Sequence, residues 1–279
     1  MIFLGHVSKD INVVKGIENI VPGGGALYGA FTARSLGEPT TVITKVAQKD
    51  RKLFEDMEGF GIEVVFLDSK ETTSIKNVYP SENPDERTST VVSRADPFSR
   101  EDLESLKDIL TNSDVHLTPL WYGEFPEDLI PVLREYALTL SGDAQGFLRH
   151  VEDGKMVYRD WKRKDEFLKL FDVFKLDSKE AKILTGTDDP KEVFRILQDL
   201  GLREIVMTRS DGVHVMRDGE ITFAPFGNWT LEGRTGRGDT CIASYLVLRK
   251  RKRSLKELTE VVALITTKKM QRPGPYRGW

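Results

Sequence analysis

The chain has 279 residues and a nearly balanced charge, with 41 Lys and Arg against 44 Asp and Glu. This balance argues against a protein built to coat nucleic acid or an anionic membrane, and no apolar run reaches membrane-spanning length. The single cysteine, Cys241, excludes an internal disulfide, and the first residues lack the basic segment of a signal peptide. We therefore expect a cytoplasmic protein with one large domain over 1–279 and with no nucleic-acid or membrane partner.

Short apolar runs alternate with amphipathic stretches along most of the chain, which is typical of a parallel sheet covered by crossover helices. The predicted strands are Ile2–Val7, Thr41–Val46, Glu63–Leu67, Val115–Thr118, Ala137–Ser141, Val173–Leu176 and Glu204–Thr208. The predicted helices, with apolar residues three and four apart, are Leu27–Leu36, Asp50–Phe60, Arg100–Leu110, Glu127–Tyr136, Ser178–Leu184, Pro190–Leu200, Asp239–Arg249 and Leu255–Met270. The pattern predicts an α/β fold, with a doubly wound, mostly parallel sheet flanked by helices.

Two stretches, 10–21 and 72–98, break this alternation because β-branched residues mix there with charges, prolines and a glycine. We expect them to form strands outside the main sheet. Packed together, they would make a small β-sheet lid over the strand ends where ligands bind. The alternative is a pair of ordinary surface hairpins.

A glycine-rich turn with the sequence GRTGRGDT occupies 233–240 and runs directly into a helical pattern. Such a turn presents backbone N–H groups and the positive helix end to an anion, so phosphate is the expected guest. The spacing is nearly that of a P-loop, but Asp239 stands where a P-loop has lysine. We interpret Asp239 as a general base for an attacking hydroxyl, with Gly236, Arg237 and Gly238 donating N–H groups to the phosphoryl group. A helix cap in which Asp239 accepts first-turn N–H groups fits the same spacing.

The three glycines at 23–25 also precede a helix, but they do not form the dinucleotide-binding fingerprint. A Rossmann dehydrogenase is therefore disfavoured. Glycines at this place allow the backbone to approach a small polar ligand closely. A simple tight turn is the alternative.

These two segments, at this separation, resemble those of the ribokinase-like carbohydrate kinases, or phosphofructokinase B family. The family's D-T-x-G-A-G-D-T motif corresponds to 233–240, where the first Asp is lost and Arg237 replaces a small residue. A strand ending in Gly with Asp soon after matches 5–10, and a di-glycine segment matches 23–37. The resemblance implies acceptor binding by Asp10, Gly23, Gly24, Gly25, Tyr28 and Arg149, where Tyr28 replaces an Asn common in the family.

Two internal segments extend the resemblance. Residues 175–186 are similar to the family's Asn-x-x-Glu segment, which implies that Glu180 and Asp177 help to place Mg²⁺ through water. Without the resemblance, Glu180 is an ordinary acid in the first turn of a helix. Residues 206–212 resemble the strand and turn beside the nucleotide, so the resemblance assigns nucleotide binding to Thr208, Ser210, Gly212 and Thr235.

The resemblance implies a kinase that uses ATP and Mg²⁺ to phosphorylate a hydroxyl of a small sugar or sugar derivative. A ketose, an aldopentose, a sugar acid and a cyclic polyol such as inositol all stay open as acceptors. A nucleoside kinase of the same fold and a non-catalytic nucleotide- or sugar-binding regulatory module are the alternatives, and Asp239 speaks against the module. Relatives often pair through their lids, which implies a homodimer.

Overall fold

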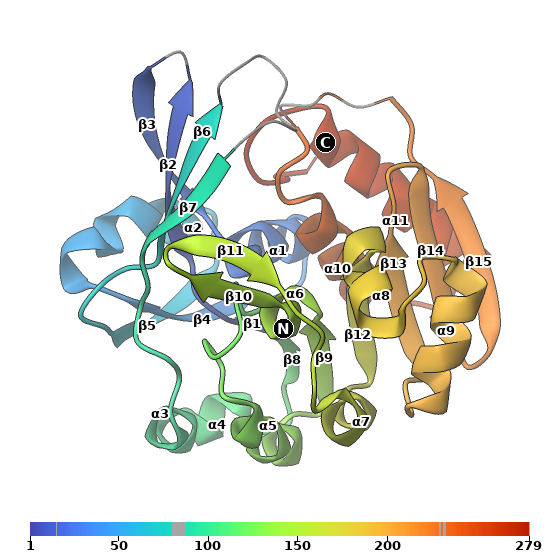
Figure 1. The fold of residues 1–279 in the computed structure, drawn as a ribbon. Coiled ribbons are helices and arrows are strands. Elements are labelled where there is room, and N and C mark those ends of the chain that lie inside the picture. Colours follow the sequence, from blue (N-terminus) through green and yellow to red (C-terminus); the bar gives the residue numbers. More distant parts are fainter. Residues whose placement is uncertain (15, 80–87, 229, 231–232, 279) are drawn as a thin grey trace.

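The computed structural model describes residues 1–14, 16–79, 88–228, 230 and 233–278 (Figure 1). Its larger sheet has nine strands in the order β15-β14-β13-β12-β9-β8-β1-β4-β5. Seven strands are parallel, and β14 and β15 add an antiparallel edge. The bounds are β1 (Ile2–Leu4), β4 (Thr41–Val46), β5 (Glu63–Asp68), β8 (Asp114–Leu117), β9 (Thr139–Asp143), β12 (Val173–Asp177), β13 (Glu204–Thr208), β14 (Gly212–Arg217) and β15 (Glu220–Pro225).

All seven predicted strands are present, which confirms the doubly wound, mostly parallel α/β fold. The strand predicted over 2–7 is shorter, because β1 ends at Leu4. Beyond it, the N–H of His6 donates to Glu124 Oε1 and the N–H of Val7 donates to Thr44 Oγ1, so side chains take the place of a neighbouring strand. This departure from the sheet leads the chain out toward the second sheet.

Helices cover both faces of the nine-stranded sheet (Figure 1). Three predicted helices are divided into shorter α and 3-10 segments, at 50–60, 100–110 and 127–136. The bounds are α1 (Gly25–Ser35), η1 (Gln48–Phe54), α2 (Glu55–Gly59), α3 (Arg100–Ser105), α4 (Lys107–Leu110), η3 (Glu127–Leu129), α5 (Ile130–Tyr136), α6 (Gln145–Leu148), α7 (Lys164–Phe167), η4 (Leu168–Leu170), α8 (Ser178–Thr185), α9 (Pro190–Asp199), α10 (Arg237–Leu248) and α11 (Leu255–Met270). Among the helices of the described residues, none is long and apolar enough to cross a bilayer.

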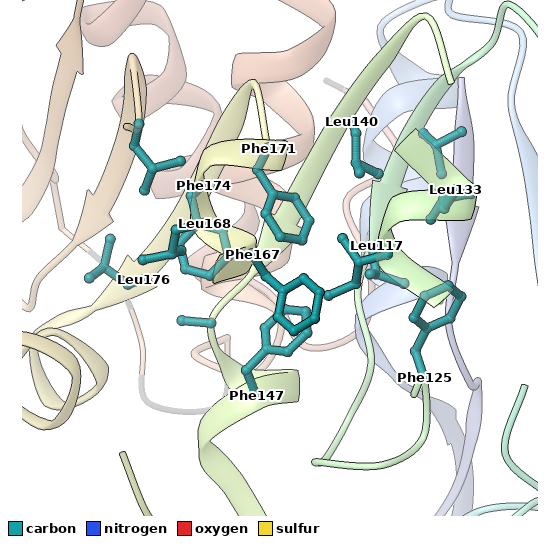
Figure 2. Packing of buried hydrophobic residues seen from close by; sticks show 14 of the residues in the cluster. Leu117, Phe125, Leu133, Leu140, Phe147, Phe167, Leu168, Phe171, Phe174 and Leu176 are labelled. Carbon is teal, nitrogen blue, oxygen red and sulfur yellow. The ribbon is translucent and has the colours of Figure 1, made fainter. Parts of the chain in front are cut away.

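The core follows from the alternation of side chains along the buried strands. In β1, Leu4 joins the cluster under α3–α9, whereas Phe3 joins the cluster under α1. Figure 2 shows the first of these clusters, where aromatic rings from α6, α7 and β12 meet. Phe147 stacks on Trp161 with ring centroids 4.1 Å apart. This packing fixes the strands whose C-terminal ends carry the candidate site.

A second sheet of six strands lies beside the main one (Figure 1). Its order is β10-β11-β7-β6-β2-β3, with bounds β10 (Arg149–Glu152), β11 (Lys155–Tyr158), β7 (Thr88–Ser93), β6 (Ser74–Tyr79), β2 (Ser8–Val14) and β3 (Ile17–Gly23). The two predicted segments supply four of these strands, and β10 and β11 were not predicted. Ile75 and Val91 pack on Leu120 and Trp121, so this face of the small sheet is turned toward the main sheet. Residues 80–87 of the predicted lid lie outside the described residues, and its role as a lid stays a prediction.

Candidate active site

The glycine loop, residues 233–238, enters α10 between two other helices. Gly236 caps α10 in the left-handed region, with φ of 80°. A Cβ on Gly236 would lie 2.2 Å from Tyr28 Cδ1 of α1, and a Cβ on Gly233 would lie 1.9 Å from the carbonyl oxygen of Met270. Both positions therefore exclude any larger residue, and the loop is held in one shape at the N-terminal end of a twelve-residue helix.

Asp239 lies in the first turn of α10, against the start of α1. A Cβ on Gly25 would be 2.8 Å from Asp239 Oδ1 and 2.4 Å from Thr118 Oγ1. Thr118 is buried, and its hydroxyl has no partner among the described residues. Desolvation and the negative charge of Asp143 raise the pKa of Asp239, while Lys175 opposes them. A desolvated carboxylate is a stronger base, which suits proton removal from a hydroxyl.

Lys175 is a buried cation under the glycine loop that the sequence analysis missed. Its Nζ lies 3.1 Å from Asp143 Oδ2 and 3.5 Å from Glu180 Oε2, and 3.0 Å from where a Cβ on Gly238 would be. Burial opposes its charge, but Asp143 and Glu180 raise the pKa of Lys175 above its ordinary value. The signal in the sequence is a lysine inside an otherwise apolar strand, a place where charge is rare without a partner.

Asp177 and Glu180 cap α8 reciprocally. The N–H of Glu180 donates to Asp177 Oδ1 at 2.8 Å, and the N–H of Asp177 donates to Glu180 Oε2 at 2.7 Å. Within the described part of the chain, no three His, Cys, Asp or Glu side chains converge as a metal site. A magnesium ion held chiefly by phosphate oxygens, with these two acids reached through water, stays a prediction.

On the opposite side, Asp10 of β2 lies against the predicted glycine segment. Ser8 Oγ donates to Asp10 Oδ1 at 2.7 Å, and a Cβ on Gly23 would be 2.5 Å from Asp10 Oδ2. Gly24 has φ of 98° and passes close to the carbonyl oxygen of His6. The backbone of 23–25 thus touches Asp10 at one end and Asp239 at the other, which brings together residues from both ends of the sequence.

A row of polar side chains continues from Asp10 across the small sheet. Asn12, Asn77 and Ser89 are register partners on three adjacent strands. Asn77 Nδ2 donates to Asn12 Oδ1 at 3.1 Å, and Ser89 Oγ donates to Asn77 Oδ1 at 2.6 Å. Asn77 and Ser89 alternate with Lys76 and Thr90, so they share the face of Ile75 and Val91 that is turned toward the main sheet. No local pattern along the chain predicts this row, because its members lie on three strands, of which β2 is far from β6 and β7 in the sequence.

The remaining predicted residues lie in two groups. Tyr28 packs its ring under Gly236, and Arg149 lies near Asp143 and Glu180, with its guanidinium centre 5.7 Å from the Tyr158 ring centroid. On the far side of Asp177, Thr208 is buried and is its register partner. Further out are the exposed Ser210, Gly212 at the start of β14, and the exposed Thr235.

Among the solved structures that are similar to this chain along nearly its whole length, three are about half identical to it in sequence. A pyrophosphate-dependent kinase of the ribokinase family, in a sulfate complex, is 50% identical, with a TM-score of 0.91 and 99% and 98% of the two chains covered. A pyrophosphate-dependent kinase of that family, bound to a pyrophosphate analogue and myo-inositol, is 49% identical, with a TM-score of 0.90 and the same coverage.

The third structure belongs to work on a pyrophosphate-dependent myo-inositol-1 kinase. Two substitutions, one of Asn by Leu and one of Ser by Leu, convert that kinase into a myo-inositol-3 kinase. It is 48% identical, with a TM-score of 0.89 and 99% and 95% of the chains covered. No family model matches the chain, and neither does any curated protein. The fold and the structural matches define a phosphotransferase of the carbohydrate-kinase class. The chain belongs to the ribokinase family.

Proposed function

We propose that the protein transfers a phosphoryl group from pyrophosphate to a hydroxyl of a cyclic polyol such as myo-inositol. The observation that carries this proposal is the identity of 48–50%, over nearly the whole chain, with kinases described as pyrophosphate-dependent. The resemblance of the motifs alone implied ATP, and ATP is the alternative donor. The other sugars and the nucleosides are the alternative acceptors.

The charges of the donor side support pyrophosphate. Arg237 opens α10, and no carboxylate of the described residues lies within ion-pair distance of its guanidinium group. Desolvation and the charge of Arg234 lower the pKa of Arg237, so an anion at this place would relieve the repulsion. Because pyrophosphate has no nucleoside to bind, its recognition depends on charge, and a guanidinium group can contact two phosphate oxygens at once. Arg237 stands where the family motif has a small residue.

The proposed reaction is an in-line displacement at one phosphorus of pyrophosphate. Asp239 takes the proton of the acceptor hydroxyl, the oxygen attacks that phosphorus, the bridging P–O bond breaks and orthophosphate leaves. The N–H groups of Gly236, Arg237 and Gly238, together with Lys175 beneath them, stabilise the charge of the moving phosphoryl group. Magnesium bound to the phosphate oxygens, with Asp177 and Glu180 acting through water, would neutralise part of the donor's charge.

The polar row of the small sheet supports a polyol acceptor. Asp10 accepts hydrogen bonds, whereas Asn12 and Asn77 both accept and donate, so neighbouring hydroxyls of one ring can be paired in order. Thr118 adds, beside Asp239, a hydroxyl that has no hydrogen-bond partner among the described residues. We further propose that the small sheet closes over the acceptor as a lid and excludes water, which would otherwise take the phosphoryl group.

A matrix of donors and acceptors tests the proposal. Pyrophosphate and ATP are each combined with Mg²⁺ and with myo-inositol, ribose, fructose, a sugar acid or adenosine, and products are followed by ³¹P NMR. The expected result is an inositol monophosphate formed from pyrophosphate, with Asp239→Asn as the inactive control. Transfer from ATP with no transfer from pyrophosphate would overturn the donor proposal, and phosphorylation of another acceptor class alone would overturn the polyol.

A further inference from the structure

Lys269, in the last turn of α11, is a second buried cation at the glycine loop. Its side chain is almost wholly enclosed, with 2% of the residue exposed. Its Nζ donates to the carbonyl oxygen of Gly233 at 2.6 Å, and it lies 5.5 Å from the centroid of the Tyr28 ring, which packs against Gly236. One ammonium group therefore supports both ends of residues 233–236, directly at Gly233 and through Tyr28 at Gly236.

Among the described residues, the ammonium group of Lys269 is not paired with a carboxylate. No acid of the described residues lies within ion-pair distance, and the carbonyl oxygen of Gly233 is the one hydrogen-bond acceptor found for Nζ there. Desolvation lowers the pKa of Lys269 to about 8, although the charge of Asp239 opposes this. Among the described residues, the titratable groups that face it are Asp239 of α10 and Tyr28 of α1, and Arg234 and Arg237 add positive charge on the glycine loop. An enclosed ammonium in these surroundings costs stability.

We propose that Lys269 is a positioning residue that holds the glycine loop in its phosphate-binding shape, and that the phosphate donor supplies a counter-charge to its ammonium group. This inference rests on the proposed phosphotransfer, and it assigns the α11 lysine to donor binding. A neutral side chain of similar length would fill the space without attracting an anion. We therefore expect replacement of Lys269 by a neutral residue to weaken binding of the donor and to leave binding of the acceptor unchanged.

Two substitutions of Lys269 and one control substitution of the neighbouring Lys268 test the proposal. Lys269→Met removes the charge, Lys269→Arg keeps it, and Lys268→Met alters the exposed lysine next to it on the same helix. We expect Lys269→Met to raise the KM for the donor about tenfold, the scale of one charge-assisted hydrogen bond, with less than about twofold change in the acceptor KM. Lys269→Arg should restore most of the loss, and Lys268→Met should behave as the wild type.

A pH profile separates positioning by charge from mere packing. In the free wild-type enzyme, Lys269 is charged below pH 8 and neutral above it, so kcat/KM for the donor should fall as the pH rises through about 8. This fall should be absent in Lys269→Met and should move to higher pH in Lys269→Arg. Donor KM and pH profile both unchanged in a folded Lys269→Met variant would overturn the proposal.

The proposal stays testable if Lys269→Met does not fold or if the wild-type enzyme is inactive. If Lys269→Met does not fold, the pH profiles of the wild type and of Lys269→Arg decide. The proposal is overturned if kcat/KM for the donor does not fall near pH 8 in the wild type. It is also overturned if the fall stays at the same pH in Lys269→Arg. If the wild type transfers from neither pyrophosphate nor ATP, the proposed function fails by itself. Calorimetric binding of pyrophosphate then tests Lys269 alone: weaker binding to Lys269→Met supports the inference, and equal binding overturns it.

Discussion

The charged side chains at the glycine loop include the cations Lys175, Arg237 and Lys269, whereas the small sheet across the site offers acid, amide and hydroxyl groups. Those groups are Asp10, Asn12, Asn77 and Ser89. Cations attract an anion of almost any orientation, but amides and hydroxyls bind only partners whose donors and acceptors are placed correctly. We therefore propose that the donor side recognises charge and that the acceptor side recognises the arrangement of hydroxyls, with Asp239 between them.

The largest effect is expected from Asp239→Asn, which removes the base without removing any cation. We expect kcat to fall about 10²- to 10⁴-fold, the usual contribution of general-base catalysis. Pyrophosphate binding, followed by calorimetry, should be retained or strengthened because a negative charge beside the donor is lost. An Asp239→Asn enzyme with wild-type turnover would show that the phosphoryl group passes from donor to acceptor at a place other than Asp239.

Arg237→Ala tests whether charge selects the donor, since it restores the small residue of the family motif. The KM for pyrophosphate should rise about 10- to 100-fold, the scale of a hydrogen bond to a charged group, and the acceptor KM should hardly change. The exposed Arg253, beyond the end of α10, provides the matched control as Arg253→Ala. Equal donor KM values in the two variants would contradict the role of Arg237.

Replacing the polar row should change the product more than the rate. The double variant Asn77→Leu/Ser89→Leu removes the polar side chains on β6 and β7 that are proposed to bind hydroxyls of the polyol. In this variant, myo-inositol should therefore present another hydroxyl to Asp239. The position of the phosphate is read by NMR of the product, with kcat expected within about tenfold of the wild type because the catalytic groups are untouched. Val78→Leu, on the other face of β6, is the control, and an unchanged product in the double variant would remove the row from acceptor recognition.

The smallest expected effect is on stability. Because the pKa of Lys269 is lowered, folding favours its neutral form, and the burial penalty is present below about pH 8 and fades as the pH rises toward the ordinary value for lysine. Lys269→Met should therefore raise Tm at pH 7 by about 2 °C or more and raise it less near pH 10. A lower Tm at pH 7 would mean that the charge is better satisfied than its surroundings indicate.

The parallel strands were predictable because strands buried on both faces leave continuous apolar runs, as in Val173–Leu176 and Glu204–Thr208. The hairpins β10–β11 and β14–β15 were missed although each carries a local signal, an Asp-Gly pair at 153–154 or 218–219 whose positive φ values suit a two-residue hairpin turn.

Some residues of the candidate site could be predicted from the local sequence, and others could not. Asp239 and the glycines around it carry a local signature, because the backbone shape of the loop demands those residues. Lys269 has none, since a lysine near the end of a helix is expected for the helix dipole alone. Its enclosure under Gly233 depends on how α11 packs against the loop, which no local pattern records. Asn77 likewise acquires meaning only from its register with Asn12 and Ser89.

The most direct test of a donor side that recognises charge alone is the ratio of kcat/KM for pyrophosphate to that for ATP, measured with myo-inositol and Mg²⁺. The account predicts efficient transfer from pyrophosphate, release of orthophosphate equal to the inositol phosphate formed, and little or no transfer from ATP. A ratio in favour of ATP would contradict it.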